Sequence, residues 1–179
     1  MTKLLLAHRS FPGQFRWMLP KLVQLGIEVV FFCIEKTEWP TQGVKVIEIK
    51  PKKGDKNFSD IGYEFVNESL IAGAKLLEEG WIPDCIISHY GWGIWKISEI
   101  FEKTKLIIYC EWWYNNSNRN YHRWRSDELS FDESLAEGLN NASFRASINR
   151  ADVAVTPSEW QRSMFPSDIK SKLRVIEDG

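Results

Sequence analysis

The chain of 179 residues has few cysteines and no excess of charge of one sign. Cys33, Cys85 and Cys110 are scattered and lack the spacing of zinc ligands, so we expect neither a disulfide framework nor a metal site. We expect them to be reduced thiols in or beside apolar strands. The formal net charge of −1 gives no sign of the basic excess that usually accompanies nucleic-acid binding, so no nucleic-acid partner is expected.

Long apolar runs are also missing. No segment approaches the ~20 apolar residues that a membrane span needs, and the first apolar run ends at His8, too early for a secretory signal. A cytoplasmic protein is therefore expected.

The first loop lacks the pattern G-x-G-x-x-G and no Tyr-x-x-x-Lys pair occurs, which disfavours a nucleotide-dependent oxidoreductase or epimerase.

Short apolar runs alternate with helical patterns along the whole chain. Seven runs are typical of strands: residues 3–7, 27–34, 44–49, 84–88, 106–110, 153–156 and 173–176. Helical spacing lies between them, at residues 15–22, 61–77, 92–101 and 135–148, with a short helix starting near residue 158. This alternation predicts an α/β fold: a Rossmann-like parallel sheet of about seven strands with helices on both faces.

Ligands of such sheets bind outside the carboxyl ends of the strands. That rule selects four loops, at residues 8–14, 89–93, 111–114 and 157–159. The first loop reads HRSFPGQ and leads into a helical pattern, where free backbone N–H groups favour an anion and a glycine permits close approach. An ordinary turn would explain the same residues. The candidate binding residues of this loop are His8, Arg9, Pro12, Gly13 and Gln14.

The second and third loops combine polar and aromatic side chains. Nine tryptophans are many for a chain of this length, and several fall in polar, loop-like sequence. Sugar rings present C–H faces to aromatic rings and hydroxyl groups to carboxylates, so these loops suit carbohydrate. The candidates here are His89, Gly91, Trp92, Glu111, Trp112, Trp113 and Tyr114.

The fourth loop and one basic segment leave alternatives open. Ser158 is well placed to cap a helix, with Gln161 at the spacing of a capping box, and Ser158 and Glu159 are also candidate ligand contacts. Residues 115–125 are polar, basic and aromatic. They suit a surface loop, a phosphate, single-stranded nucleic acid or an anionic membrane surface, although no RNA-binding motif supports nucleic acid.

Five segments in this order resemble the N-terminal domain of family 4 (group 1) glycosyltransferases, which have the GT-B fold. They are residues 8–15 (HRSFPGQF), 25–29 (LGIEV), 83–89 (PDCIISH), 151–162 (ADVAVTPSEWQR) and 173–179 (LRVIEDG). The resemblance spans the whole chain.

The resemblance implies a domain, a reaction and two catalytic residues. Residues 1–179 would form the acceptor-side domain, facing a C-terminal donor-binding domain, with an E-x7-E motif, that is absent from this chain. The enzyme would transfer a sugar from a nucleotide-sugar to a glycan, lipid or small-molecule acceptor. Such transfer is typically retaining, and needs no metal or tightly bound cofactor. By position, His89 matches the site loop after the fourth strand, and Glu111 stands where many members have a histidine.

A stand-alone Rossmann-like module that binds a sugar, a nucleotide or a protein without catalysis is the alternative. A second α/β domain encoded after Gly179 would favour the enzyme, and a natural stop codon there would favour the module. The isolated domain would be inactive and would expose the face that its partner domain covers, which favours a homodimer.

Overall fold

The computed structural model describes residues 1–50, 58–90, 94–114 and 130–177. Its strands are β1 (Lys3–Ala7), β2 (Ser10–Phe11), β3 (Glu28–Cys33), β4 (Glu35–Lys36), β5 (Val44–Glu48), β6 (Cys85–His89), β7 (Lys105–Tyr109), β8 (Val153–Thr156) and β9 (Leu173–Val175). Its helices are α1 (Met18–Gln24), α2 (Phe58–Glu78), α3 (Phe131–Arg150), α4 (Glu159–Ser163) and α5 (Ser167–Lys170), with the 3-10 helices η1 (Gly13–Phe15) and η3 (Ile94–Glu99).

Seven strands form one parallel sheet in the order β5-β3-β1-β6-β7-β8-β9. The predicted α/β fold and the predicted number of strands are therefore confirmed. β5 lies at one edge, as its alternating pattern predicts, because an edge strand needs less apolar surface than a central one. A second, two-stranded pair of β2 with β4 lies outside the main sheet and has no counterpart in the predicted strands.

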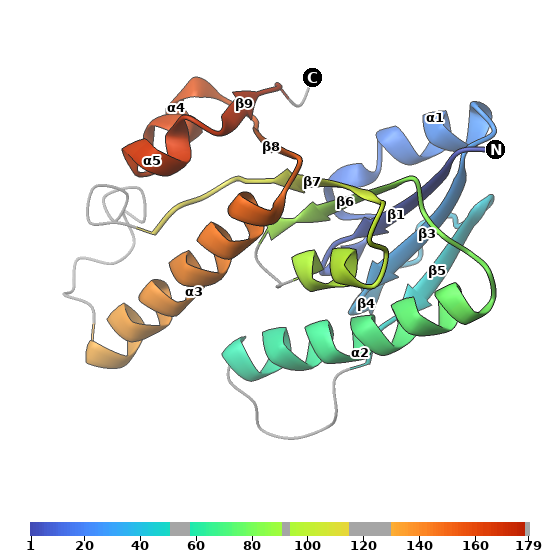
Figure 1. The fold of residues 1–179 in the computed structure, drawn as a ribbon, viewed down its shortest axis with the longest axis horizontal. Coiled ribbons are helices and arrows are strands. Elements are labelled where there is room, and N and C mark those ends of the chain that lie inside the picture. The colour runs from blue at the N-terminus through green and yellow to red at the C-terminus, as the bar shows by residue number, and fades with distance from the viewer. Residues whose placement is uncertain (51–57, 91–93, 115–129, 178–179) are drawn as a thin grey trace.

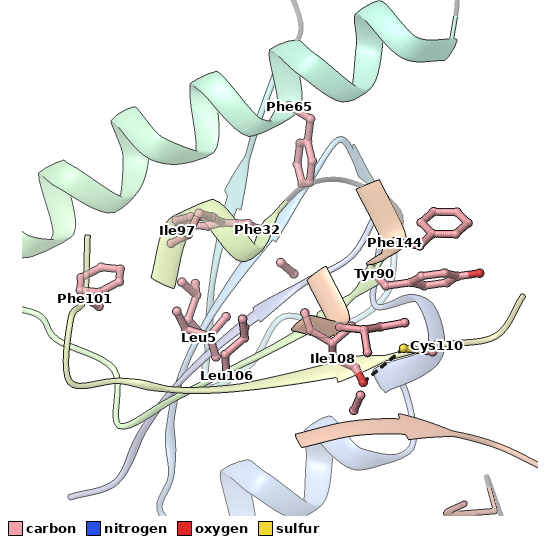
Figure 2. Close-up of a cluster of buried hydrophobic side chains, with 14 of the residues drawn as sticks. Leu5, Phe32, Phe65, Tyr90, Ile97, Phe101, Leu106, Ile108, Cys110 and Phe144 are labelled. Atoms are coloured by element: carbon pink, nitrogen blue, oxygen red, sulfur yellow. Dashed lines mark hydrogen bonds between the residues drawn. The ribbon is translucent and has the colours of Figure 1, made fainter. Parts of the chain in front are cut away.

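Helices cover both faces of the sheet (Figure 1). Successive residues of a strand point to opposite faces, so Leu5 and Leu6 belong to two different hydrophobic clusters. Leu5 packs in the large cluster on the side of α2, η3 and α3, part of which Figure 2 shows, with Phe65, Ile97 and Phe144. Leu6 packs in the smaller cluster beneath α1.

The ends of the first helix follow local chemistry. The helical spacing begins at residue 15, and Pro20 within it allows either a kink or a late start. The structure shows the late start, since α1 begins at Met18 and Pro20 falls in its first turn, where a missing N–H costs no helical hydrogen bond. Gly26 ends the helical region with φ of +71°, a left-handed conformation that favours glycine. The helix predicted over residues 92–101 is instead the 3-10 helix η3, since spacing by three residues suits both forms.

The cysteines lie where the sequence predicts. Cys33 and Cys110 are buried, Cys85 is half-buried, and all three are free thiols. Burial raises the pKa of Cys33 and of Cys85 to about 11, so these thiols stay protonated and act as small apolar side chains.

Candidate functional site

Three adjacent strands bring the predicted site residues to one edge of the sheet. β1, β6 and β7 are neighbours and run in parallel, so the residues that follow their carboxyl ends lie side by side. His8 follows β1, His89 ends β6, and Glu111 comes two residues after β7. The prediction that these residues share one rim is confirmed by the contacts among their side chains.

The centre of the rim is a carboxylate held by two side chains. Nε2 of His89 lies 3.2 Å from Oε2 of Glu111, and because an ionised carboxylate only accepts, the imidazole is the donor. The side-chain amide of Gln14 donates to the other oxygen, Oε1. Gln14 belongs to the β1–α1 connection, so three separate segments of the chain meet at this one carboxylate.

His8 completes the cluster from the other side. Its ring lies edge-on to that of His89, with 5.7 Å between centroids. Its Nδ1 lies 3.1 Å from the backbone nitrogen of Ser10 and 2.9 Å from the backbone oxygen, so that residue fixes the imidazole. Gly13 lies directly against His8, since a Cβ atom at position 13 would stand 2.3 Å from Nδ1. Gly13 therefore serves the packing of His8, in addition to its φ of +52°.

Burial keeps the His8 imidazole neutral, whereas hydrogen bonding keeps the Glu111 carboxylate charged. Burial is the main cause that lowers the pKa of His8 below its ordinary value, which favours the neutral imidazole. The hydrogen bond from His89 is the main cause that lowers the pKa of the Glu111 carboxyl, and partial burial opposes it. The rim thus presents an ionised carboxylate beside a neutral His8 at neutral pH.

The three aromatic residues after Glu111 have different surroundings. Trp112 is half-buried and its ring lies 6.2 Å from that of Trp160, which is 52% exposed. Trp113 is only 7% exposed and packs in the core between Phe144 and Phe165. The structure thus corrects the expected substrate contact of Trp113, because its ring is used for packing and is not presented at the rim.

Tyr114 also turns toward the helix α3. Its ring stacks on Phe144, with centroids 5.9 Å apart, and its backbone N–H donates to Oδ1 of Asn141. The Asn141 amide donates in return to the Tyr114 carbonyl oxygen at 2.7 Å. These contacts tie the end of the loop to α3.

Ser158 and Glu159 are occupied by contacts of their own helix. The Ser158 hydroxyl accepts from the backbone N–H of Gln161 at 3.1 Å, so the predicted helix cap is confirmed. Glu159 pairs with Arg162 at 3.3 Å. Trp160, which the loop pattern does not single out, is the residue of this segment whose ring lies next to Trp112, the residue after Glu111.

Arg9 and Pro12 lie on the outer part of the first loop. Arg9 forms an exposed ion pair with Glu35 at 3.1 Å, and its carbonyl oxygen accepts from the backbone of Ile34 and Glu35. Pro12 directly precedes η1. An apolar hollow of about 620 Å³ adjoins this loop on the α1 face; Gly13, Gln14 and Trp17 line it together with Tyr109 of β7.

Several expected features stay predictions. Gly91, Trp92 and the segment 115–125 lie outside the described residues, so the expected sugar contact of the first two and the expected membrane contact of the segment are not placed. Within the described residues no group of three or more His, Cys, Asp or Glu side chains could hold a metal ion. No helix in that same part of the chain is long and apolar enough to cross a membrane.

Sequence reasoning missed Tyr90. Its phenol is buried and hydrogen-bonds to the backbone of Trp112: the hydroxyl accepts from the N–H at 2.7 Å and donates to the carbonyl oxygen. The sequence showed only a tyrosine after His89 in an aromatic loop. No local pattern could have identified its partner, which lies 22 positions further along the chain.

The sequence profile of a family described as "Glycosyl transferase family 4 group" matches residues 26–179. A search of curated proteins finds no match. Among solved structures, Os79 from O. sativa in complex with UDP superimposes with a TM-score of 0.61 at 8% identity, covering 98% of this chain and 51% of that one.

Two further solved structures are similar. A UGT transferase from Siraitia grosvenorii in complex with UDP has a TM-score of 0.58 at 13% identity, covering 98% of this chain and 51% of that one. Phytolacca americana UGT2, complexed with UDP-2fluoro-glucose and pterostilbene, has a TM-score of 0.58 at 8% identity, with 98% and 53% covered. At these identities the likeness shows the fold, which is the predicted GT-B type, and the chain spans about half the length of each structure.

Proposed function

Because this chain belongs to the glycosyl transferase family 4 group, we propose that it forms the acceptor-side domain of an enzyme that transfers a sugar from a nucleotide-sugar to an acceptor hydroxyl. The observation that carries this proposal is the ionised Glu111 carboxylate, held by His89 and Gln14 at the carboxyl edge of the sheet. Ligands of parallel α/β sheets bind at that edge.

In this proposal each residue of the rim has one task. Glu111 accepts a hydrogen bond from a sugar hydroxyl or stabilises positive charge that develops on the transferred sugar. His89 keeps Glu111 ionised and oriented, and the neutral imidazole of His8 lies on the other side of His89. Trp112 and the exposed ring of Trp160 contact the apolar face of the acceptor's sugar. A carboxylate beside aromatic rings is the combination that recognises carbohydrate.

The donor would be bound by a second domain beyond residue 179. Support comes from the coverage, since 98% of this chain aligns with only 51% of Os79, a structure that contains UDP. We propose a nucleotide-sugar as the donor, transfer with retention of the anomeric configuration, and no requirement for a metal ion, as the family resemblance implies. Glycan, lipid and small-molecule acceptors remain the candidate classes.

A direct assay tests this function. The full-length protein is incubated with UDP-, GDP-, ADP- and CDP-sugars and with saccharide and lipid acceptors, and release of the nucleoside diphosphate is followed by chromatography. We expect release that depends on an acceptor and persists in EDTA, and NMR coupling constants of the product should show the donor's anomeric configuration. No release from any donor would contradict the proposed function, and an inverted product would contradict retention.

The variant Glu111→Gln tests the site itself. It keeps the size of the side chain but removes the charge, so we expect kcat to fall by about 10²-fold or more. Glu79→Gln is the matched control, because Glu79 is an exposed residue that pairs with Lys45 at 3.2 Å, away from the rim. Unchanged turnover in Glu111→Gln would remove Glu111 from the site.

A further inference from the structure

The loop that carries Glu111 is attached to the neighbouring loop by one buried side chain. Tyr90 directly follows His89 at the end of β6, and its hydroxyl binds both the N–H and the carbonyl oxygen of Trp112, the residue after Glu111. Each member of the His89–Glu111 pair is therefore followed by a residue of the Tyr90–Trp112 pair. The second contact fixes the separation of the two loops at the point where the first contact forms.

Tyr90 is itself held from two sides. It is 2% exposed, and its ring lies against Phe144 of α3 (Figure 2). The two ring centroids are 3.9 Å apart. The Ser147 hydroxyl, one turn further along α3, lies 3.1 Å from the Tyr90 carbonyl oxygen and 2.9 Å from that of Ser143, and its proton is shared between them. The phenol is thus a rigid element of the core. Burial raises the pKa of the Tyr90 phenol well above its ordinary value, so the hydroxyl keeps the proton that it donates to Trp112.

In the described residues, the strand pairing of β7 with β8 ends before this loop. β7 ends at Tyr109, and the N–H of Cys110 donates to the Val155 carbonyl oxygen at 2.7 Å. Beyond it, the Tyr90 hydroxyl binds both the N–H and the carbonyl oxygen of Trp112. Without that hydroxyl the N–H and the C=O of Trp112 both lose this hydrogen bond, which costs stability and loosens the backbone next to Glu111.

We propose that Tyr90 is a positioning residue, whose buried hydroxyl sets the backbone at Trp112 so that the Glu111 carboxylate meets His89. The assignment of the pair to sugar transfer rests on the proposed function; the positioning itself rests on the geometry alone. The Tyr90 ring lies beside the His89 imidazole, with 4.9 Å between centroids, and its hydroxyl binds the backbone of Trp112. Tyr90 therefore acts on the reaction through the His89–Glu111 pair.

The test is Tyr90→Phe in the full-length protein, with Thr104→Val as the matched control. Both changes remove one buried hydroxyl that donates to a backbone carbonyl; that of Thr104 binds the Pro83 carbonyl oxygen at 2.6 Å, at the amino end of the same strands. Both variants should therefore lower stability to urea. Only Tyr90→Phe should displace the Glu111 carboxylate relative to His89.

The discriminating readout is the ionisation of Glu111. In protein labelled with 13C at the glutamate carboxyl carbon, the Glu111 resonance is assigned by its absence in Glu111→Gln and is titrated with pH. We expect its pKa to rise toward the ordinary value in Tyr90→Phe and to stay in place in Thr104→Val. We also expect kcat to fall by on the order of 10²-fold, the effect of a displacement of about 1 Å, while the KM for the donor stays constant.

Two results would overturn the proposal. One is a Glu111 titration that is unchanged in Tyr90→Phe, or that shifts equally in Thr104→Val. The other is a shifted titration with kcat at the wild-type value. If the proposed function is wrong, the wild-type protein will transfer no sugar. In that case the Glu111 titration alone tests whether Tyr90 positions the pair.

Discussion

The Nε2 atom of His89 lies 3.2 Å from a carboxylate oxygen of Glu111, although 22 positions separate the two residues in the chain. Parallel pairing explains this proximity. His89 stands opposite Tyr109 in the register of β6 and β7, so Glu111 follows its strand just beyond the level of His89. The pair is thus a consequence of two neighbouring strands that end at the same height, and the predictions below concern the contacts around it.

Replacing Gly13 with alanine should disturb His8. The new Cβ would stand 2.3 Å from Nδ1 of His8, and the φ of +52° is unfavourable for any residue with a Cβ. We expect a loss of roughly 1–2 kcal/mol from the backbone alone, and a lower kcat/KM for transfer because the imidazole must move. Urea unfolding and steady-state kinetics measure the two effects.

Gly26→Ala is the control for the loss of stability that comes from backbone strain. Gly26 has φ of +71°, but nothing lies within 4 Å of its would-be Cβ. This variant should lose a similar amount of stability through strain and keep its activity. Equal activity in the two variants would show that the contact between Gly13 and His8 has no part in the site.

Acid should destabilise the folded protein in two steps. Burial holds the pKa of His8 in the folded protein below its ordinary value of 6.5. Between pH 6.5 and that lower pKa, His8 is protonated in the unfolded chain but not in the folded one, so the unfolded state is favoured. Glu111 has a lowered pKa, so its contribution is present above pH 4.5 and is lost as the pH falls through the folded value. Stability should therefore decline below pH 6.5 and again below pH 4.5.

Urea midpoints between pH 7.5 and 3.5 measure this profile. His8→Gln should flatten the first decline, and Glu111→Gln should reduce the second. Asp152 and Asp168 also have lowered pKa values, through hydrogen bonds from Lys105 and Arg145 respectively, and they keep part of the second decline in every variant. A first decline of wild-type size in His8→Gln would refute the assignment to His8.

Alanine variants of two tryptophans should distinguish a side chain that stabilises the core from one that binds the acceptor. Trp113 lies in the core, so Trp113→Ala should cost about 3–5 kcal/mol of stability. Trp160 is 52% exposed beside Trp112, so Trp160→Ala should change stability by about 0.5 kcal/mol or less but raise the KM for a saccharide acceptor. Chemical unfolding and acceptor titrations test the pair, and an unchanged KM in Trp160→Ala would contradict a sugar contact there.

The strands were predictable because their signal is local. The observed ranges of β1 and β8 equal the predicted ones, since a run of apolar residues bounded by polar ones defines a buried strand without help from other segments. Helix type was less predictable. Ile94, Ile97 and Ile100 repeat at a spacing that fits an α-helix and a 3-10 helix alike, and the structure forms the latter up to Glu99.

Local sequence carries no information on which of several adjacent aromatic rings enters the core. Trp112, Trp113 and Tyr114 follow a strand without any period, and their burial depends on where α3 and the chain around Phe165 come to lie. The same holds for Tyr90, whose hydroxyl partner belongs to another loop. Trp160 escaped prediction because an exposed ring in a short helix is usually an ordinary surface residue.

By itself, the sequence determined that the chain builds a parallel sheet and that His8, His89 and Glu111 follow strands at its carboxyl edge. That much depends only on apolar periodicity and on the rule that parallel strands end at a common edge. The tertiary structure alone decided that β1, β6 and β7 are neighbours, and therefore that Gln14 and His89 share one carboxylate while Tyr90 holds the adjacent backbone. Strand order and loop contacts arise from packing between distant segments, which no local pattern encodes.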